Sequence, residues 1–118
     1  MANMEKMRED TARLINEWGQ NLTIKRRPHA DGSHGQEAGG WEIVQQGGQD
    51  TIKGDAQPTG GSVVLQKQGR EITINYRILL PYDADVEPND RIYFDDTYCR
   101  VEVADKHPDH VEVLGRIE

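Results

Sequence analysis

The 118-residue chain carries a net charge of −7, with 35% apolar and 30% charged residues, and its length is typical of one domain, residues 1–118. Such an acidic balance repels phosphate backbones and disfavours ordinary nucleic-acid binding. A single cysteine excludes an internal disulfide, and no apolar run approaches a membrane-spanning length. We therefore expect a soluble protein of a reducing cytoplasm, with no membrane partner.

The charge is unevenly distributed along the chain. Residues 1–27 hold six Lys or Arg against four acids, whereas residues 28–118 hold eight against seventeen. A weakly basic head on an acidic body favours docking to another protein over binding to DNA.

Residues 4–18, MEKMREDTARLINEW, have the apolar spacing of a helix, and Gly19 is a suitable stop. A helix this short is marginal alone, so its apolar stripe must pack on another surface. That surface is either the core of the domain or a neighbouring subunit. The candidate partner-facing residues are Met4, Met7, Leu14 and Trp18.

The segment after the helix alternates short strands with glycine-rich stretches. Residues 21–27 form an expected strand, and residues 28–40, PHADGSHGQEAGG, form an expected mobile loop. Two further short strands are expected at 41–46 and 50–58.

Residues 59–69, TGGSVVLQKQG, are predicted to form a second mobile loop, because glycines flank them on both sides. The apolar trio inside this segment, Val63-Val64-Leu65, is unusual for a loop. One interpretation is an ordinary hairpin loop whose trio covers its own core.

The second half of the chain is the more regular. Residues 70–82, REITINYRILLPY, alternate apolar and polar side chains and predict a long strand. An acidic connector at 83–90 follows. After it come a hairpin of two alternating strands at 90–105, which we call the ribbon, and a last strand at 110–118.

These elements predict a mainly β fold. We expect a small antiparallel β-barrel or sandwich of about six strands over residues 20–118, with an N-terminal α-helix over residues 1–19 and long Gly-rich loops.

The ribbon predicts its own register. A hairpin closed over Asp96-Thr97 pairs Phe94 with Cys99 and Arg91 with Glu102, which places the apolar pairs on one face. A four-residue loop over 95–98 keeps the same faces. Asp-Thr is a poor two-residue turn, because β-branched Thr resists positive φ. In either case Cys99 points inward as an inert core residue.

Catalytic or metal chemistry has little support in the sequence. His107 and His110 flank Asp109, but a metal site needs about three or four ligands and the remainder is missing. Ser33 and Ser62 lie outside any nucleophile motif. We expect no enzyme, no cofactor, no metal and no small-molecule substrate.

A small β-barrel can also bind single-stranded nucleic acid on an aromatic, basic face. This alternative function would use the four tyrosines, although the acidic composition opposes it. These are Tyr76, Tyr82, Tyr93 and Tyr98.

Four segments, in this order, resemble the head–tail joining family of tailed bacteriophages, the head-completion or stopper proteins of the connector. They are Gly54 to Pro58, Leu80 to Asp83, Asp90 to Val101, and Val111 to Arg116. The resemblance covers about residues 50–118. The chain departs from the family at the turn of the ribbon, where Asp96-Thr97 replaces the usual Asp-Gly.

The resemblance implies a structural virion protein made in the cytoplasm of a bacterial host. It implies that copies form a ring in the neck, between portal or adaptor and tail-completion proteins. Such a ring would join head to tail and retain or gate the double-stranded DNA, which is only passing cargo. Another neck or tail-completion component is the alternative within the same particle.

In such a ring, loops enter the central channel as a plug. The candidate plug loop of this chain comprises Thr59, Gly60, Gly61, Ser62, Val63, Val64, Leu65, Gln66 and Lys67.

Overall fold

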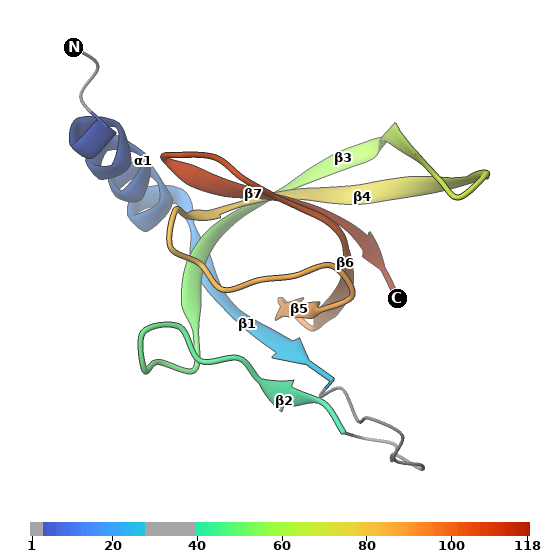
Figure 1. Cartoon of the computed structure of the whole chain (residues 1–118), viewed down its shortest axis with the longest axis horizontal. Helices are drawn as coiled ribbons and strands as arrows, with labels where there is room; N and C mark the ends of the chain where they lie inside the picture. Colours follow the sequence, from blue (N-terminus) through green and yellow to red (C-terminus); the bar gives the residue numbers. More distant parts are fainter. Residues whose placement is uncertain (1–3, 28–39) are drawn as a thin grey trace.

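The computed structural model describes residues 4–27 and 40–118 (Figure 1). The elements are α1 (Met4–Trp18), β1 (Gln20–Arg26), β2 (Glu42–Ile43), β3 (Ile52–Lys67), β4 (Arg70–Pro81), β5 (Arg91–Phe94), β6 (Thr97–Lys106) and β7 (His110–Ile117). The loop predicted over 28–40 lies, except for Gly40, outside the described residues. Among the described residues, no helix has the length and apolar content needed to cross a membrane.

The strands form one antiparallel sheet that closes on itself. Its order is β2-β1-β3-β4-β7-β6-β5, and an additional pairing of β1 with β5 closes the ring. The two-residue β2 adds to the end of β1. The predicted mainly β barrel with an N-terminal helix is therefore confirmed, and the described residues contain seven strands instead of about six.

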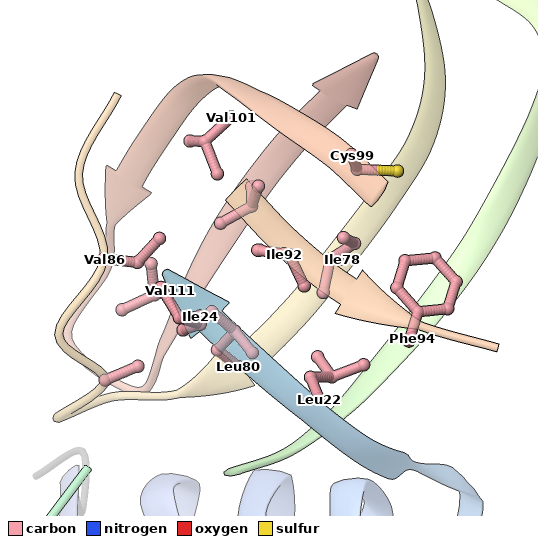
Figure 2. Close-up of a cluster of buried hydrophobic side chains, with 12 residues drawn as sticks. Leu22, Ile24, Ile78, Leu80, Val86, Ile92, Phe94, Cys99, Val101 and Val111 are labelled. Carbon is pink, nitrogen blue, oxygen red and sulfur yellow. The ribbon is translucent and has the colours of Figure 1, made fainter. Parts of the chain in front are cut away.

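Apolar side chains fill the inside of this ring (Figure 2). They alternate with outward-facing polar residues along each strand, because successive side chains of a strand point to opposite faces. The members are Leu22, Ile24, Ile78, Leu80, Ala84, Val86, Ile92, Phe94, Cys99, Val101, Val111 and Val113.

Gly54 of β3 is packed against residues of β1 and β4. A Cβ atom on this residue would come within 2.5 Å of Leu22 Cδ1 and 2.7 Å of Leu80 Cδ2. The glycine of the first family-like segment is thus a packing requirement of the barrel.

The helix α1 lies beside the barrel, outside the closed sheet (Figure 1). Its Ile15 is buried. Arg8 Nε donates a 2.9 Å hydrogen bond to the Pro108 carbonyl, and Thr11 Oγ1 donates one of 3.1 Å to Asp109 Oδ2. The helix is therefore attached to the turn between β6 and β7 as well as to the sheet.

The segment 59–69 is strand and turn, so the predicted loop is wrong in its secondary structure. β3 continues to Lys67, and a tight turn at Gln68-Gly69, both with positive φ, leads into β4. The pairing shifts register between Pro58 and Val63, where Gly60 and Gly61 have φ of 68° and 79°. These glycines form a β-bulge inside a strand, because φ values in this region cost glycine little.

The ribbon forms the expected hairpin in a different register. Ile92 pairs with Cys99 and Arg91 with Arg100, so the predicted pairs Phe94–Cys99 and Arg91–Glu102 are wrong. The turn residues are Asp95 and Asp96, with φ of 50° and 58°. Asp tolerates positive φ better than Thr, so the turn lies one residue earlier, and the register moves by two residues. Because that shift preserves the faces, Cys99 is buried as predicted.

Candidate interaction surfaces

The hairpin of β3 and β4 extends well beyond the barrel (Figure 1). We call residues 59–75 the arm. Val63 pairs with Ile74 and Leu65 with Ile72 on one face, while Val64 lies on the other face with 51% of its surface exposed. The arm thus contains all the residues predicted for the plug, but these residues lie in a strand of a two-stranded hairpin instead of in a loop.

Two side-chain hydrogen bonds fix the base of the arm. Thr59 Oγ1 donates a hydrogen bond to the Ile74 carbonyl, and Ser62 Oγ donates one of 2.8 Å to the Thr59 carbonyl. These bonds satisfy backbone groups that the bulge removes from the ladder. The bulge is therefore a defined bend.

A buried carboxylate ties the far end of the arm to the barrel. Glu102 lies at a bulge in β6, between the pairing positions of Val101 and Val103. Its Oε1 is 3.3 Å from Lys67 Nζ, and its Oε2 accepts a 3.1 Å hydrogen bond from Arg116 Nε. Two cations compensate the burial of one carboxylate, which holds the arm in a fixed direction.

The apolar stripe of α1 is divided between the core and the surface. Ile15 is buried, whereas Met7 and Leu14 are exposed, Leu14 with 57% of its surface. The side chains of Met4 and Trp18 lie outside the described residues. One side of the stripe therefore packs on the barrel, whereas Met7 and Leu14 face solvent. A partner for these exposed residues stays a prediction.

Leu14 also lines a pocket of about 340 Å³ between α1 and the sheet. Its other lining residues come from α1, β3, β4, the β6–β7 turn and the start of β7. They are Thr11, Ile15, Asp55, Gln57, Leu79, Asp109 and His110.

Four basic side chains lie next to one another across four paired strands. The registers place Lys25 opposite Arg91, Arg91 opposite Arg100, and Arg100 opposite Arg116. All four face outward, because their neighbours along the strands face the core. We call these residues the basic row; at the usual strand spacing it spans about 14 Å.

Aromatic rings flank the basic row. Tyr93 and Tyr98 are cross-strand neighbours with ring centroids 4.6 Å apart. The Arg91 guanidinium lies 4.3 Å from the Trp41 centroid and 5.5 Å from that of Tyr98, and Lys25 Nζ lies 5.4 Å from the latter. Cation–π contacts thus hold two of the four cations in place, Lys25 and Arg91.

The basic row could not be found from the sequence, because its members are far apart along the chain. The predicted register set Arg91 opposite Glu102, which would have alternated charges at this place. Only the register of the paired strands brings the four basic residues together.

The acidic connector 83–90 is held by one arginine. Arg26 donates from Nε to Asp90 Oδ1 at 2.9 Å and from a terminal nitrogen to Asp85 at 3.0 Å. Asp90 is 2% exposed and also accepts the Glu87 N–H at 2.8 Å. The hydrogen bond with Asp90 raises the pKa of Arg26 above its already high value. Asp90 of the family-like segment is therefore a structural residue.

The histidines of the β6–β7 turn stack on one another, with ring centroids 4.6 Å apart. His110 Nδ1 is 2.9 Å from Asp109 Oδ1. Although desolvation opposes ionisation of Asp109, its hydrogen bonds with His110 and Thr11 hold its pKa below the usual value. The turn is thus a hydrogen-bonded unit that α1 also contacts.

Asp105, His107 and Glu112 have potential metal-ligand atoms within 4.8 Å of one another. Glu112 Oε2 is also 3.0 Å from Arg77 Nε, and His107 Nε2 is 3.5 Å from Asp105 Oδ2. A metal ion at this place would compete with Arg77 for Glu112. This trio differs from the His107–His110 pair considered in the sequence.

No protein-family model matches the chain, and no curated protein matches it. Among solved structures, it is similar to the phage-like element PBSX protein xkdH from Bacillus subtilis. The identity is 12% and the TM-score is 0.49, over 85% of this chain and 96% of that chain. A likeness of this degree assigns no function.

Proposed function

We propose that the chain is a structural virion protein that joins the phage head to the tail and helps to retain packaged DNA. Copies of it would form a ring in the neck, between portal or adaptor proteins and tail-completion proteins. Double-stranded DNA would pass as cargo, and the role involves no catalytic step.

The family-like segments are consistent with a structural role. Gly54 permits the close packing of three strands, and Asp90 anchors Arg26 inside the acidic connector. Asp95 and Asp96 form the hairpin turn. The residues that carry the resemblance therefore build the barrel itself.

The arm is the observation that carries the proposal. A two-stranded ribbon is marginally stable alone in water, and closing the barrel does not require one. This ribbon has three half-buried apolar residues and the buried Ile74 along one face, and Val64 is exposed on the other. Such a ribbon suits contact with neighbouring copies or projection into a shared channel.

Shortening the arm tests this function. Residues 64–73 are replaced by Asn-Gly, which closes a two-residue turn directly after the Val63–Ile74 pair. The variant is supplied in trans to the encoding phage or prophage from which the gene has been deleted. We expect a folded protein, with particles that lose DNA or fail to join head and tail.

A full-length Thr73→Ser variant is the matched control for expression and incorporation, because it keeps Val64, both strands of the arm and their register. DNA content per particle and the fraction of tailed heads in electron micrographs are the readouts. Normal DNA retention and normal tailing with the shortened arm would contradict the proposal.

A further inference from the structure

The barrel wall carries an acidic counterpart of the basic row. Asp55 pairs with Leu79, Leu79 with Glu112, and Glu112 with Asp105, so three carboxylates lie in one line across β3, β4, β7 and β6. Their strand neighbours Gly54, Leu80 and Val111 face the core. We call Asp55, Glu112 and Asp105 the acidic row.

Each row is only partly neutralised within the chain. In the basic row, Arg91 pairs with Glu118 and Arg116 with Glu102. Lys25 and Arg100, by contrast, have neutral hydrogen-bond partners among the described residues, the Tyr98 hydroxyl and Asn89 Oδ1, each at 3.2 Å.

The acidic row shows the same division. Glu112 pairs with Arg77, whereas Asp55 accepts from the Gln57 amide at 2.8 Å, and Asp105 faces His107. Like charges directly opposite one another destabilise a sheet. Each row therefore presents charge that an opposite surface from outside the chain would stabilise.

The two rows lie at separate places on the wall. β7 contributes Glu112 near its start and Arg116 near its end, which places the rows about 13 Å apart along this strand. A contact between two different patches is heterologous, and repeated with a closing rotation it produces a ring.

We propose that the basic row of one copy of this chain docks on the acidic row of the next copy. The inference rests on the proposed function, and it names the surfaces through which the ring would assemble. Trp41, Tyr93 and Tyr98 lie around the basic row, and Trp, Tyr and Arg are the residue types that dominate interface energetics.

A second copy fits the basic row better than single-stranded nucleic acid does. Base stacking needs free ring faces, but here Arg91 lies over Trp41 and Tyr98, and Lys25 lies over Tyr93 and Tyr98. The net charge of −7 also repels a phosphate backbone, while it supplies acidic surface for another copy.

Neutral substitutions test the docking mode. The basic-row variant is Lys25→Gln with Arg100→Gln, and the acidic-row variant is Asp55→Asn with Asp105→Asn. The control, Lys6→Gln with Arg13→Gln, makes the same charge change as the basic-row variant on exposed positions of α1. Sedimentation velocity at low and high salt gives the size of each species, and circular dichroism checks that each variant is folded.

We expect the wild type and the control to self-associate at low ionic strength and to dissociate as salt is raised. Each row variant alone should associate more than about tenfold more weakly. A 1:1 mixture of the two row variants should form a dimer and stop there, because each keeps one intact row.

A monomeric wild type at low salt, or variants that associate as the wild type does, would overturn the docking mode. Binding of fluorescent oligothymidylate that depends on Lys25 and Arg100 would also overturn it, in favour of nucleic acid. None of these three results bears on the particle experiment with the shortened arm. Failure of the docking mode can therefore be distinguished from failure of the proposed function.

Discussion

Glu102 and Lys67 join the arm to the barrel: the carboxylate oxygen lies 3.3 Å from the ammonium nitrogen, and the Glu102 side chain is only 5% exposed. The same carboxylate also binds Arg116. One buried acid therefore couples the direction of the arm to the last strand of the sheet.

Glu102→Gln should destabilise the fold by about 1–3 kcal/mol, because the amide replaces two charge-assisted contacts with weaker ones. Lys67→Met should cost less, since Arg116 still compensates the carboxylate. Urea denaturation of both variants measures the difference. Equal stability of Glu102→Gln and the wild type would show that the junction contributes nothing to the fold.

Ile74→Ala and Phe94→Ala should each cost about 2–5 kcal/mol, because both side chains are buried and their truncation leaves a cavity. Val64→Ala, at an exposed position of the arm, should change stability by less than about 0.5 kcal/mol. Chemical denaturation of the three variants makes the comparison. An Ile74 or Phe94 variant that unfolds at the same denaturant concentration as the parent would contradict the burial of that side chain.

Asp96→Gly should be tolerated, with a change of less than about 1 kcal/mol, because glycine readily adopts the positive φ of this turn position. Asp96→Val should cost more than about 1 kcal/mol, since a β-branched residue resists that conformation. Thermal unfolding distinguishes the two. If both variants melted alike, position 96 would not have the positive φ on which this turn depends.

Cys99 should be inert to a thiol reagent in the native protein, and should react fully in denaturant. Burial raises the pKa of its thiol to about 11. Above about pH 9 the unfolded thiol ionises while the folded thiol keeps its proton, so stability falls as pH rises from about 9 to 11. Cys99→Val should lose this part of the pH dependence, measured by denaturation across the window; an unchanged profile would contradict it.

The helix, the barrel and the core could be predicted because their signals are local. Apolar spacing marks α1, and alternation through Ile74 and Ile78 marks β4. Cys99 was placed correctly even in the wrong register, because a shift of two residues keeps the same face inward.

The sequence predicts a loop over residues 59–69 because Gly60 and Gly61 indicate a break, whereas the arm residues 70–75 are predicted correctly as strand. The alternation of Val63 and Leu65 around Val64 was the competing strand signal, and it prevails because the bulge absorbs both glycines.

The charged rows could not be predicted at all, since each exists only through strand register. Lys25 and Arg116 come from opposite ends of the chain and belong to one surface only after β1, β5, β6 and β7 have paired.

Cryo-electron microscopy of the neck of the encoding phage tests the central claim most directly. The account predicts a closed ring of copies of this chain between head and tail, with the β3–β4 arms contacting neighbouring copies or projecting into the channel. Purified, infectious particles that contain no copy of the chain would contradict it.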